Sequence, residues 1–202
     1  MFTEKYLNLP QKRLKVLLID NFDSFTFNLV HYLESFDCRV DVVRNDELSK
    51  LHWSNYDKLV VSPGPGLPQE AGELLSFLKL ALKNIPILGV CLGHQALSLL
   101  YGGDLINLNA VKHGVQVTCC RTSNTSVLFQ GIPNSFKVGL YHSWAVLPNF
   151  SNEFVSTLIS EDGVNMANES INDKIFSVQF HPESILTEYG KKIIENFLKF
   201  KQ

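Results

Sequence analysis

The residues best suited to chemistry in this sequence form a GVCLG motif at positions 89–93. An apolar run over residues 86–90 precedes Cys91 and helical spacing over residues 94–100 follows it, so Cys91 falls where a strand passes into a helix. A nucleophile at such a place lies on a tight turn that lifts it out of the sheet. The helix N-terminus favours the reactive thiolate, and the N–H of Leu92 can donate to a developing oxyanion. The alternative is a structural cysteine buried in an α/β core.

A possible base for this thiol lies in His181-Pro182-Glu183, directly after an apolar run over residues 175–180. A thiol nucleophile needs a base, and the base needs a group that orients it. The carboxyl ends of strands in an open α/β sheet share one edge, so Cys91 and His181 are expected there together. Glu183 can bond the far ring nitrogen of His181 and fix its tautomer. Taken alone, this segment is better explained as a surface turn. Taken with Cys91, it is better explained as the base that a thiol nucleophile needs.

The third motif is SPGPG at residues 62–66, which follows an apolar run. Its density of proline and glycine predicts a loop. It matches neither of the common glycine-rich nucleotide motifs, so nucleotide binding is not predicted. The loop can instead offer backbone N–H groups to a small polar ligand, and the alternative is a plain turn after a strand.

The spacing of the histidines and cysteines does not indicate a metal site. The six histidines do not pair at a spacing of four residues, and no C-x-x-C motif is present. Cys119 and Cys120 fall on opposite faces of a predicted strand and are expected to pack rather than to bind metal. Asp20 and Asp23 follow the first strand, where helix capping explains them.

The predicted elements form two successive patterns. In the first, strands and helices alternate, which predicts βαβ units, right-handed crossovers and a parallel sheet. Between residues 104 and 180 short strands follow one another, which predicts a mixed or antiparallel part, a small second sheet beside the first. The expected strands of the first part cover residues 14–19, 39–43, 58–61 and 86–90, and its helices 25–36, 70–83 and 94–100. The later strands cover residues 104–108, 115–119, 126–129, 136–139, 145–148, 153–159, 163–167 and 175–180, before a helix over 187–200.

Composition limits the class of protein. The chain has 202 residues, of which 45% are hydrophobic and 19% charged, which is typical of a globular protein. We expect an N-terminal arm over residues 1–13 and one domain over residues 14–202. The net charge of −2 argues against nucleic-acid binding, and no apolar run approaches the roughly 20 residues of a membrane helix. The polar N-terminus is unlike a secretory signal, so we expect a cytoplasmic protein with reduced cysteines.

Taken together, the motifs GVCLGHQ, SPGPG, YHSW and QFHPESILTEYGKKIIENFL resemble those of the class I, triad-type glutamine amidotransferases. The opening IDNFDSFTFNL also resembles this group, so the likeness runs from about Leu14 to the C-terminus. It is strongest to the glutamine amidotransferase component of anthranilate synthase and aminodeoxychorismate synthase. The resemblance implies a flavodoxin-like, mostly parallel sheet with helices on both faces and a small antiparallel sheet.

The resemblance also implies roles for single residues. It makes Cys91 the nucleophile, His181 the base and Glu183 the orienting carboxylate. It implies an oxyanion hole formed by the N–H groups of Gly64 and Leu92. The implied glutamine subsite consists of Gly64, Pro65, Gly66, Gln95, Ser143 and Trp144. Three positions depart from the commonest family pattern, since Leu140 stands in place of Arg, Trp144 in place of Leu, and Val115 in place of the Lys often found after a His-Gly pair.

The implied activity is hydrolysis of L-glutamine through a cysteine thioester, with delivery of ammonia to a separate chorismate-using synthase subunit. The resemblance implies no cofactor in this chain and Mg²⁺ in that partner, and it leaves tryptophan and folate synthesis both open. One alternative is a stand-alone Cys-His hydrolase of the same fold, such as a γ-glutamyl hydrolase relative, and another is a catalytically idle binding subunit. The SPGPG loop and Gln95 favour an ammonia-delivering enzyme over the first, and the intact triad counts against the second.

Overall fold

The computed structural model describes residues 13–123, 125–148 and 150–201, and within these it leaves the side chains of residues 109–111 undescribed. The predicted arm over residues 1–13 lies outside this part except for Arg13. The strands are β1 (Lys15–Asp20), β2 (Arg39–Arg44), β3 (Lys58–Val61), β4 (Ile87–Val90), β5 (Leu105–Arg121), β6 (Ser135–Val146), β7 (Val155–Ser160), β8 (Asn165–Ser170) and β9 (Ile175–Val178). The α-helices are α1 (Thr26–Glu34), α2 (Leu74–Ala81), α3 (Leu92–Leu100) and α4 (Gly190–Lys199).

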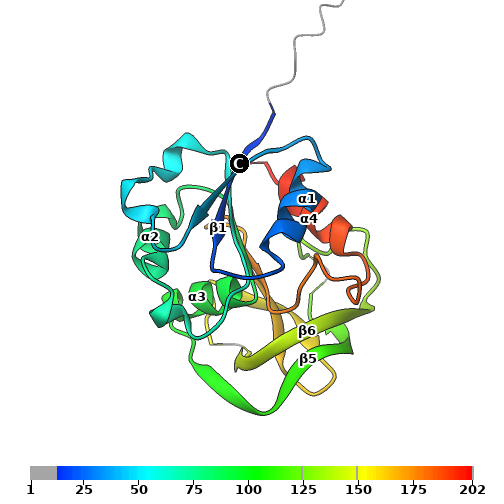
Figure 1. The fold of residues 1–202 in the computed structure, drawn as a ribbon. Helices are drawn as coiled ribbons and strands as arrows, with labels where there is room; N and C mark the ends of the chain where they lie inside the picture. The colour runs from blue at the N-terminus through cyan, green and yellow to red at the C-terminus, as the bar shows by residue number, and fades with distance from the viewer. Residues whose placement is uncertain (1–12, 124, 149, 202) are drawn as a thin grey trace, which may run out of the picture.

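One nine-stranded sheet runs through this part of the chain in the order β2-β1-β3-β4-β9-β8-β7-β5-β6. Figure 1 shows β1, which belongs to the first part of this order, and the β5–β6 pair that ends it. The first five strands pair in parallel. Their order is the flavodoxin-like one, in which ligands bind at the carboxyl ends of the strands. Every residue of β3 and β4 is buried, as expected for strands covered on both faces. The parallel part predicted from the sequence is therefore confirmed.

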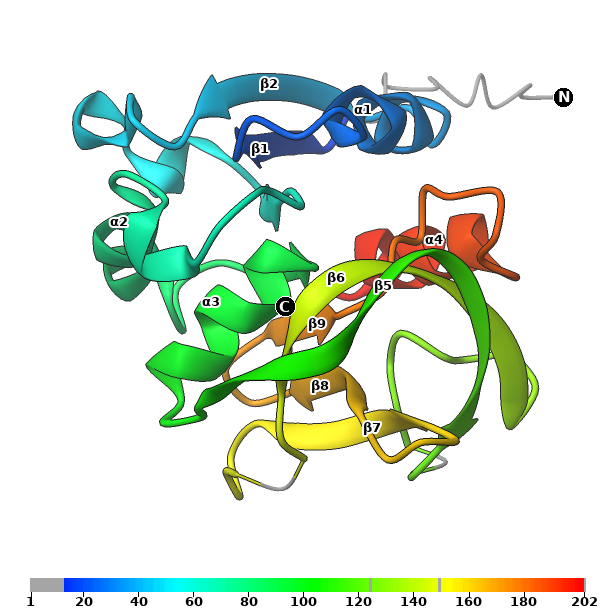
Figure 2. The ribbon, with the colours of Figure 1, turned by 60° about the horizontal axis from the view of Figure 1, so that its bottom comes forward.

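Helices cover both faces of the parallel strands, with α1 and α4 on one face and α2 and α3 on the other (Figure 2). Alternate residues of β1 separate these two layers. Val16 and Leu18 pack in one hydrophobic cluster with residues of α1 and α4, and Leu17 and Ile19 pack in a second cluster with residues of α2 and α3. This alternation follows from the two-residue period of a strand, and it holds the sheet rigidly between its helices.

The antiparallel strands correct the prediction of a second sheet, because they continue the first sheet from β9 through β8, β7 and β5 to β6. The strands predicted over 104–108 and 115–119 are one long strand, β5, with register shifts against β6 between Asn107 and Lys112 and between His113 and Val115. The strands predicted over 136–139 and 145–148 are likewise joined in β6. The long β5–β6 hairpin curves across the molecule (Figure 2).

The strand predicted over residues 126–129 is wrong, because these residues form a turn. The buried carboxylate of Glu169 accepts the hydroxyl of Ser126 and the N–H groups of Val127 and Leu128. Backbone donors bound by a carboxylate are not available to a neighbouring strand. In the described residues no helix is long and apolar enough to cross a membrane.

Candidate active site

Cys91 lies on a strained turn between β4 and α3, with φ 51° and ψ −100°. A side chain at Gly89 would place its Cβ 2.5 Å from the carbonyl oxygen of Gly93, and one at Gly93 would lie 2.8 Å from Val61. Both glycines are therefore required for the close packing of α3 against the sheet. Non-glycine residues held in such backbone regions cluster at functional sites. The predicted strand-to-helix position of Cys91 is confirmed, and the helix begins at once at Leu92 rather than at residue 94.

His181 and Glu183 form a buried pair in the loop after β9. The Nδ1 of His181 lies 2.7 Å from Oε1 of Glu183, and the two residues are 2% and 4% exposed. The His181 carbonyl accepts the hydroxyl of Thr187 at 2.6 Å. A side chain at Gly190 would clash with the Pro182 carbonyl, so the first residue of α4 closes over this loop. The orientation predicted for His181 by Glu183 is confirmed, and helix α4 begins later than residue 187 because Tyr189 takes a left-handed conformation before it.

The partners of His181 control its charge. Burial alone lowers the pKa of His181, but Cys91 and the Glu183 carboxylate outweigh it and raise the pKa to about 10. Two other buried histidines lack an anionic partner of this kind. Burial lowers the pKa of His94 to about 3 and that of His142 to about 4. Of these three buried histidines, His181 is therefore the one whose imidazole is protonated at neutral pH.

The SPGPG loop is held against the carboxyl end of β1 by the amide of Asn21. Asn21 Nδ2 donates to the Ser62 carbonyl at 2.9 Å, and the Ser62 hydroxyl accepts the Asn21 N–H at 2.9 Å. A side chain at Gly64 would lie 2.5 Å from the Asn21 Cβ and 2.8 Å from the Leu92 side chain. The backbone of Gly64 therefore packs directly beside the residue that follows Cys91. The proposed use of both N–H groups as an oxyanion hole stays a prediction.

A cavity of about 350 Å³ opens beside Cys91. All six residues of the predicted glutamine subsite line it together with the cysteine. The sequence reasoning did not assign a role to two further lining residues, which come from β6. The complete lining is Gly64, Pro65, Gly66, Cys91, Gln95, Tyr141, His142, Ser143 and Trp144. Such a cavity has the dimensions of a small-molecule site, with convergent polar groups on an otherwise rigid frame.

Tyr141 and Phe25 enclose the imidazole of His181. Their ring centroids lie 4.9 Å and 5.5 Å from that of His181, both in edge-on contact. Tyr141 also bonds the Ser184 hydroxyl at 3.0 Å. The only sequence signal for Tyr141 was its place in the YHSW motif. Phe25 is the first residue of the helix predicted over residues 25–36, and nothing in its spacing indicates a contact with His181.

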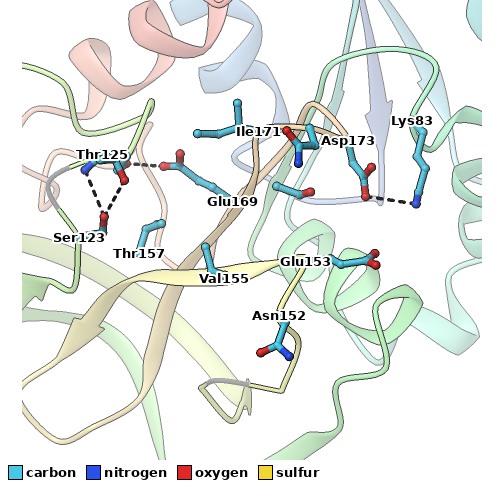
Figure 3. Close-up of a pocket in the computed structure, with 13 residues that line it drawn as sticks. Lys83, Ser123, Thr125, Asn152, Glu153, Val155, Thr157, Glu169, Ile171 and Asp173 are labelled. Atoms are coloured by element: carbon cyan, nitrogen blue, oxygen red, sulfur yellow. Dashed lines mark hydrogen bonds and ion pairs between the residues drawn. The ribbon is translucent and has the colours of Figure 1, made fainter.

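A second cavity, of about 510 Å³, lies around the turn between β8 and β9 (Figure 3). This turn precedes β9 and His181 follows it, so the two lie at opposite ends of the strand. Lys83 pairs there with Asp173 at 3.5 Å. No cysteine or histidine stands among its described lining residues, so it offers no thiol and no imidazole base. The described residues of the whole chain hold no cluster of three or more side chains suited to a metal ion.

The chain is similar in sequence to one protein family and to several named proteins, and similar in fold to solved structures. The sequence model of a family described as glutamine amidotransferase class-I matches residues 17–200. The anthranilate synthase component II of Haloarcula marismortui is 44% identical, over 90% of this chain and 96% of that protein. The aminodeoxychorismate/anthranilate synthase component 2 of Bacillus subtilis is 38% identical, over 91% and 95%. The solved structure of a glutamine amidotransferase from Thermotoga maritima shares the fold, with a TM-score of 0.74, 17% identity and coverage of 94% and 98%.

Proposed function

Because this chain belongs to the class I glutamine amidotransferase family, we propose that it hydrolyses L-glutamine at Cys91 and delivers the ammonia to a chorismate-using synthase subunit. The observation that carries the proposal is the cavity in which Cys91 meets the SPGPG loop and Gln95. The buried His181–Glu183 pair at the same edge of the sheet supplies the proton that the reaction requires. Relatives named as component II over nearly their full length support a subunit that works with a separate component I.

The first half of the proposed reaction expels ammonia. The Cys91 thiolate attacks the side-chain amide carbon of glutamine, and the N–H groups of Leu92 and Gly64 hold the oxyanion. The first N–H groups of a helix have no partner within it, so that of Leu92 is available to substrate. One such donor can contribute roughly 3–4 kcal/mol to the transition state. Protonated His181 then gives its proton to the departing nitrogen, which leaves as ammonia, and a thioester remains on Cys91.

The second half restores the enzyme. Neutral His181 takes a proton from water, and the resulting hydroxide attacks the thioester carbon. The carbon–sulfur bond breaks, glutamate leaves, and Cys91 returns as thiolate beside protonated His181. In these steps side chains and backbone N–H groups stabilise each charge that forms, so the proposed glutamine hydrolysis uses no cofactor. We assign the expected Mg²⁺ to the synthase subunit.

Replacement of the nucleophile tests the proposal. We expect Cys91→Ala to abolish glutamine-dependent product formation by the complex while product formation from added ammonia continues. The reason is that the thioester cannot form, whereas the synthase site still receives ammonia from solution. The measurement is the rate of product formation with each nitrogen source. Cys119→Ala is the matched control, because Cys119 is also buried but lies away from the cavity.

Loss of both activities in a folded Cys91→Ala complex would contradict the role of Cys91. Full glutaminase activity in that variant would contradict it equally. Incubation of the active complex with glutamine and chorismate identifies the partner reaction by its product. Anthranilate indicates tryptophan synthesis and aminodeoxychorismate indicates folate synthesis, whereas release of glutamate with neither product would leave the glutaminase and reject the chorismate partner.

Exposed apolar side chains at the catalytic edge support docking of the synthase there. Ile185 follows the triad carboxylate by two residues and is 98% exposed, and Phe22 follows β1 and is 52% exposed. A large side chain so open to water gains free energy when a partner covers it. Docking at this edge would also cover the cavity, so that ammonia could pass to the synthase without release into solvent.

We expect Ile185→Glu to weaken binding of the synthase subunit roughly 10-fold or more, since it places a charge in the interface. The stability of the isolated chain should not change, because the side chain is fully exposed. Leu80→Glu is the matched control, since Leu80 is 68% exposed on α2. Titration of each variant with the synthase, followed by glutamine-dependent activity, measures the affinity. Equal affinities for the two variants would argue against this docking edge.

A further inference from the structure

A line of buried amide groups joins the sulfur of Cys91 to the wall of the cavity. Gln179, the first residue after β9, is fully buried. Its Nε2 donates to the Cys91 sulfur at 3.7 Å, and its Oε1 accepts from Nε2 of Gln95 at 3.3 Å. A single side chain that the mechanism above does not use therefore contacts both the proposed nucleophile and a residue of the glutamine subsite.

The same contacts fix the amide of Gln95 in one orientation. A side-chain amide has two N–H donors and one carbonyl acceptor. The Nε2 of Gln95 donates to the Trp144 carbonyl at 3.0 Å as well as to Gln179, so both N–H groups are used. A reversed amide would bring its oxygen against two other oxygens. Gln95 therefore presents its carbonyl oxygen to the cavity, where it can accept an N–H of the substrate.

The far end of this line is also fixed. The Trp144 carbonyl lies 2.8 Å from Nδ1 of His142. Burial lowers the pKa of His142 to about 4, so the imidazole is neutral and Nδ1 must carry its hydrogen to donate to this carbonyl. The backbone carbonyl of Trp144 thus accepts hydrogen bonds from Gln95 and His142. The indole side chain of Trp144 takes part in neither bond. The order of partners is Cys91, Gln179, Gln95, the Trp144 carbonyl and His142.

At the sulfur end, the hydrogen bond favours one protonation state. A thiolate accepts an N–H donor more strongly than a thiol does, so a buried amide donor stabilises the charged form. His181 also stabilises that form, but it must give its proton away during the reaction. The amide of Gln179 keeps its hydrogens throughout, and it can hold the sulfur in place at both stages.

We propose that Gln179 is a positioning residue that stabilises the Cys91 thiolate with its N–H and orients Gln95 toward glutamine with its carbonyl. This inference rests on the proposed function, because it takes Cys91 as the nucleophile. Its two halves can be separated. Gln179→Glu keeps an oxygen for Gln95 but removes the amide donor to sulfur. Gln179→Met keeps the length and flexibility of the side chain and removes both groups.

The experiment measures alkylation of Cys91 by iodoacetamide against pH, with peptide mass spectrometry to identify the modified cysteine, together with the steady-state kinetics of the complex. Both variants should alkylate Cys91 roughly 10-fold more slowly at neutral pH, with the profile displaced upward by about one pH unit. Only Gln179→Met should also raise the KM for glutamine, by roughly 10-fold. Cys120 is exposed and serves as an internal reference whose alkylation rate stays constant.

Asn168→Asp is the matched control for placing a carboxylate in the core. Asn168 is also fully buried, and its amide bonds Asn165 at 2.9 Å and Ser98 at 3.4 Å rather than the sulfur. Its alkylation profile should match that of the unmodified protein. Unchanged profiles in both Gln179 variants would overturn the role at sulfur, and an unchanged KM in Gln179→Met would overturn the role at Gln95. An equal displacement in Asn168→Asp would show a general packing effect and overturn both.

An inert Cys91 in the unmodified protein would instead reject the proposed function itself. Rapid labelling of Cys91 by a chloroketone analogue of glutamine excludes that outcome before the variants are compared. Failure of the inference and failure of the proposed function are thus distinguished by the unmodified protein alone.

Discussion

A buried basic side chain lies at each edge of the parallel sheet, and the pKa values of the two are shifted in opposite directions. At the carboxyl edge His181 is 2% exposed and its pKa rises to about 10. At the amino edge Lys58, the first residue of β3, is 3% exposed, and burial lowers its pKa to about 8. Burial alone lowers the pKa of both groups, so the difference must come from their partners.

The partners differ in charge. His181 lies 2.7 Å from the Glu183 carboxylate and also interacts with Cys91. The Nζ of Lys58 donates to the Phe200 carbonyl at 2.8 Å and lies 4.9 Å from the centre of the Phe197 ring. Attraction from Cys38 and Asp57 offsets only part of its burial. Cys91 and the Glu183 carboxylate outweigh the effect of burial at His181, whereas the partners of Lys58 do not outweigh it. Two groups of similar burial therefore differ in the direction of their pKa shifts: the pKa of His181 is raised and that of Lys58 is lowered.

The largest expected effect follows from removing the carboxylate at the catalytic edge. Glu183→Gln keeps an oxygen that can accept the Nδ1–H of His181 but removes the negative charge. The pKa of His181 should fall toward the low values of His94 and His142, so the proton needed by the leaving ammonia is lost at neutral pH. We expect kcat for glutamine hydrolysis to fall roughly 10²- to 10⁴-fold. Titration of His181 by NMR, with kcat measured alongside, tests both parts.

Asp173→Asn is the matched control for Glu183→Gln. Asp173 is a partly buried carboxylate that pairs with Lys83, and it lies at the second cavity. This change should leave the His181 titration and kcat within about twofold of the original values. If the pKa of His181 stays high in Glu183→Gln, the comparison between the two edges is wrong, because a group other than Glu183 then holds the proton.

Sequence reasoning could predict the catalytic edge because its signals are local. The strand, the turn and Cys91 are contiguous, and so are the strand, His181 and Glu183. The flavodoxin-like order of the strands then brings the two segments together. The glycines of the motif could also be interpreted locally, since each permits a close approach of backbone.

The features that sequence reasoning missed depend on distant pairs. Gln179 falls in a predicted strand and opens the QFHPES motif, but no role was assigned to it, because its importance depends on Gln95, 84 residues earlier. Lys58 was read as the first residue of a strand, and nothing nearby showed that the end of the last helix covers it, 142 residues later. The merging of short predicted strands into β5 and β6 is likewise a matter of register between distant segments. Periodicity shows which face a residue occupies but not which residue it meets there.

A smaller effect is expected when the cation at the amino edge is removed. Lys58→Met keeps the long apolar stem and removes a buried charge whose attraction to Cys38 and Asp57 does not offset its burial. Replacement of a buried charge by an apolar group of similar volume is often neutral or stabilising. We therefore expect the free energy of unfolding at pH 7 to rise by about 1 kcal/mol, with glutaminase activity unchanged. Urea unfolding measures this, and Lys79→Met on the exposed face of α2 is the matched control, which should show no change.

The pH dependence of Lys58→Met gives the sharper test, because its sign follows from the direction of the shift. The folded pKa of Lys58, about 8, lies below the ordinary value of 10.5. Between these values the unfolded chain binds more protons, so the unmodified protein gains stability as pH rises. Lys58→Met lacks this gain, so its advantage should shrink above pH 8, by at most about 3 kcal/mol. A constant advantage from pH 7 to pH 10 would mean that Lys58 keeps its proton on burial, and the two edges would then differ in geometry but not in charge.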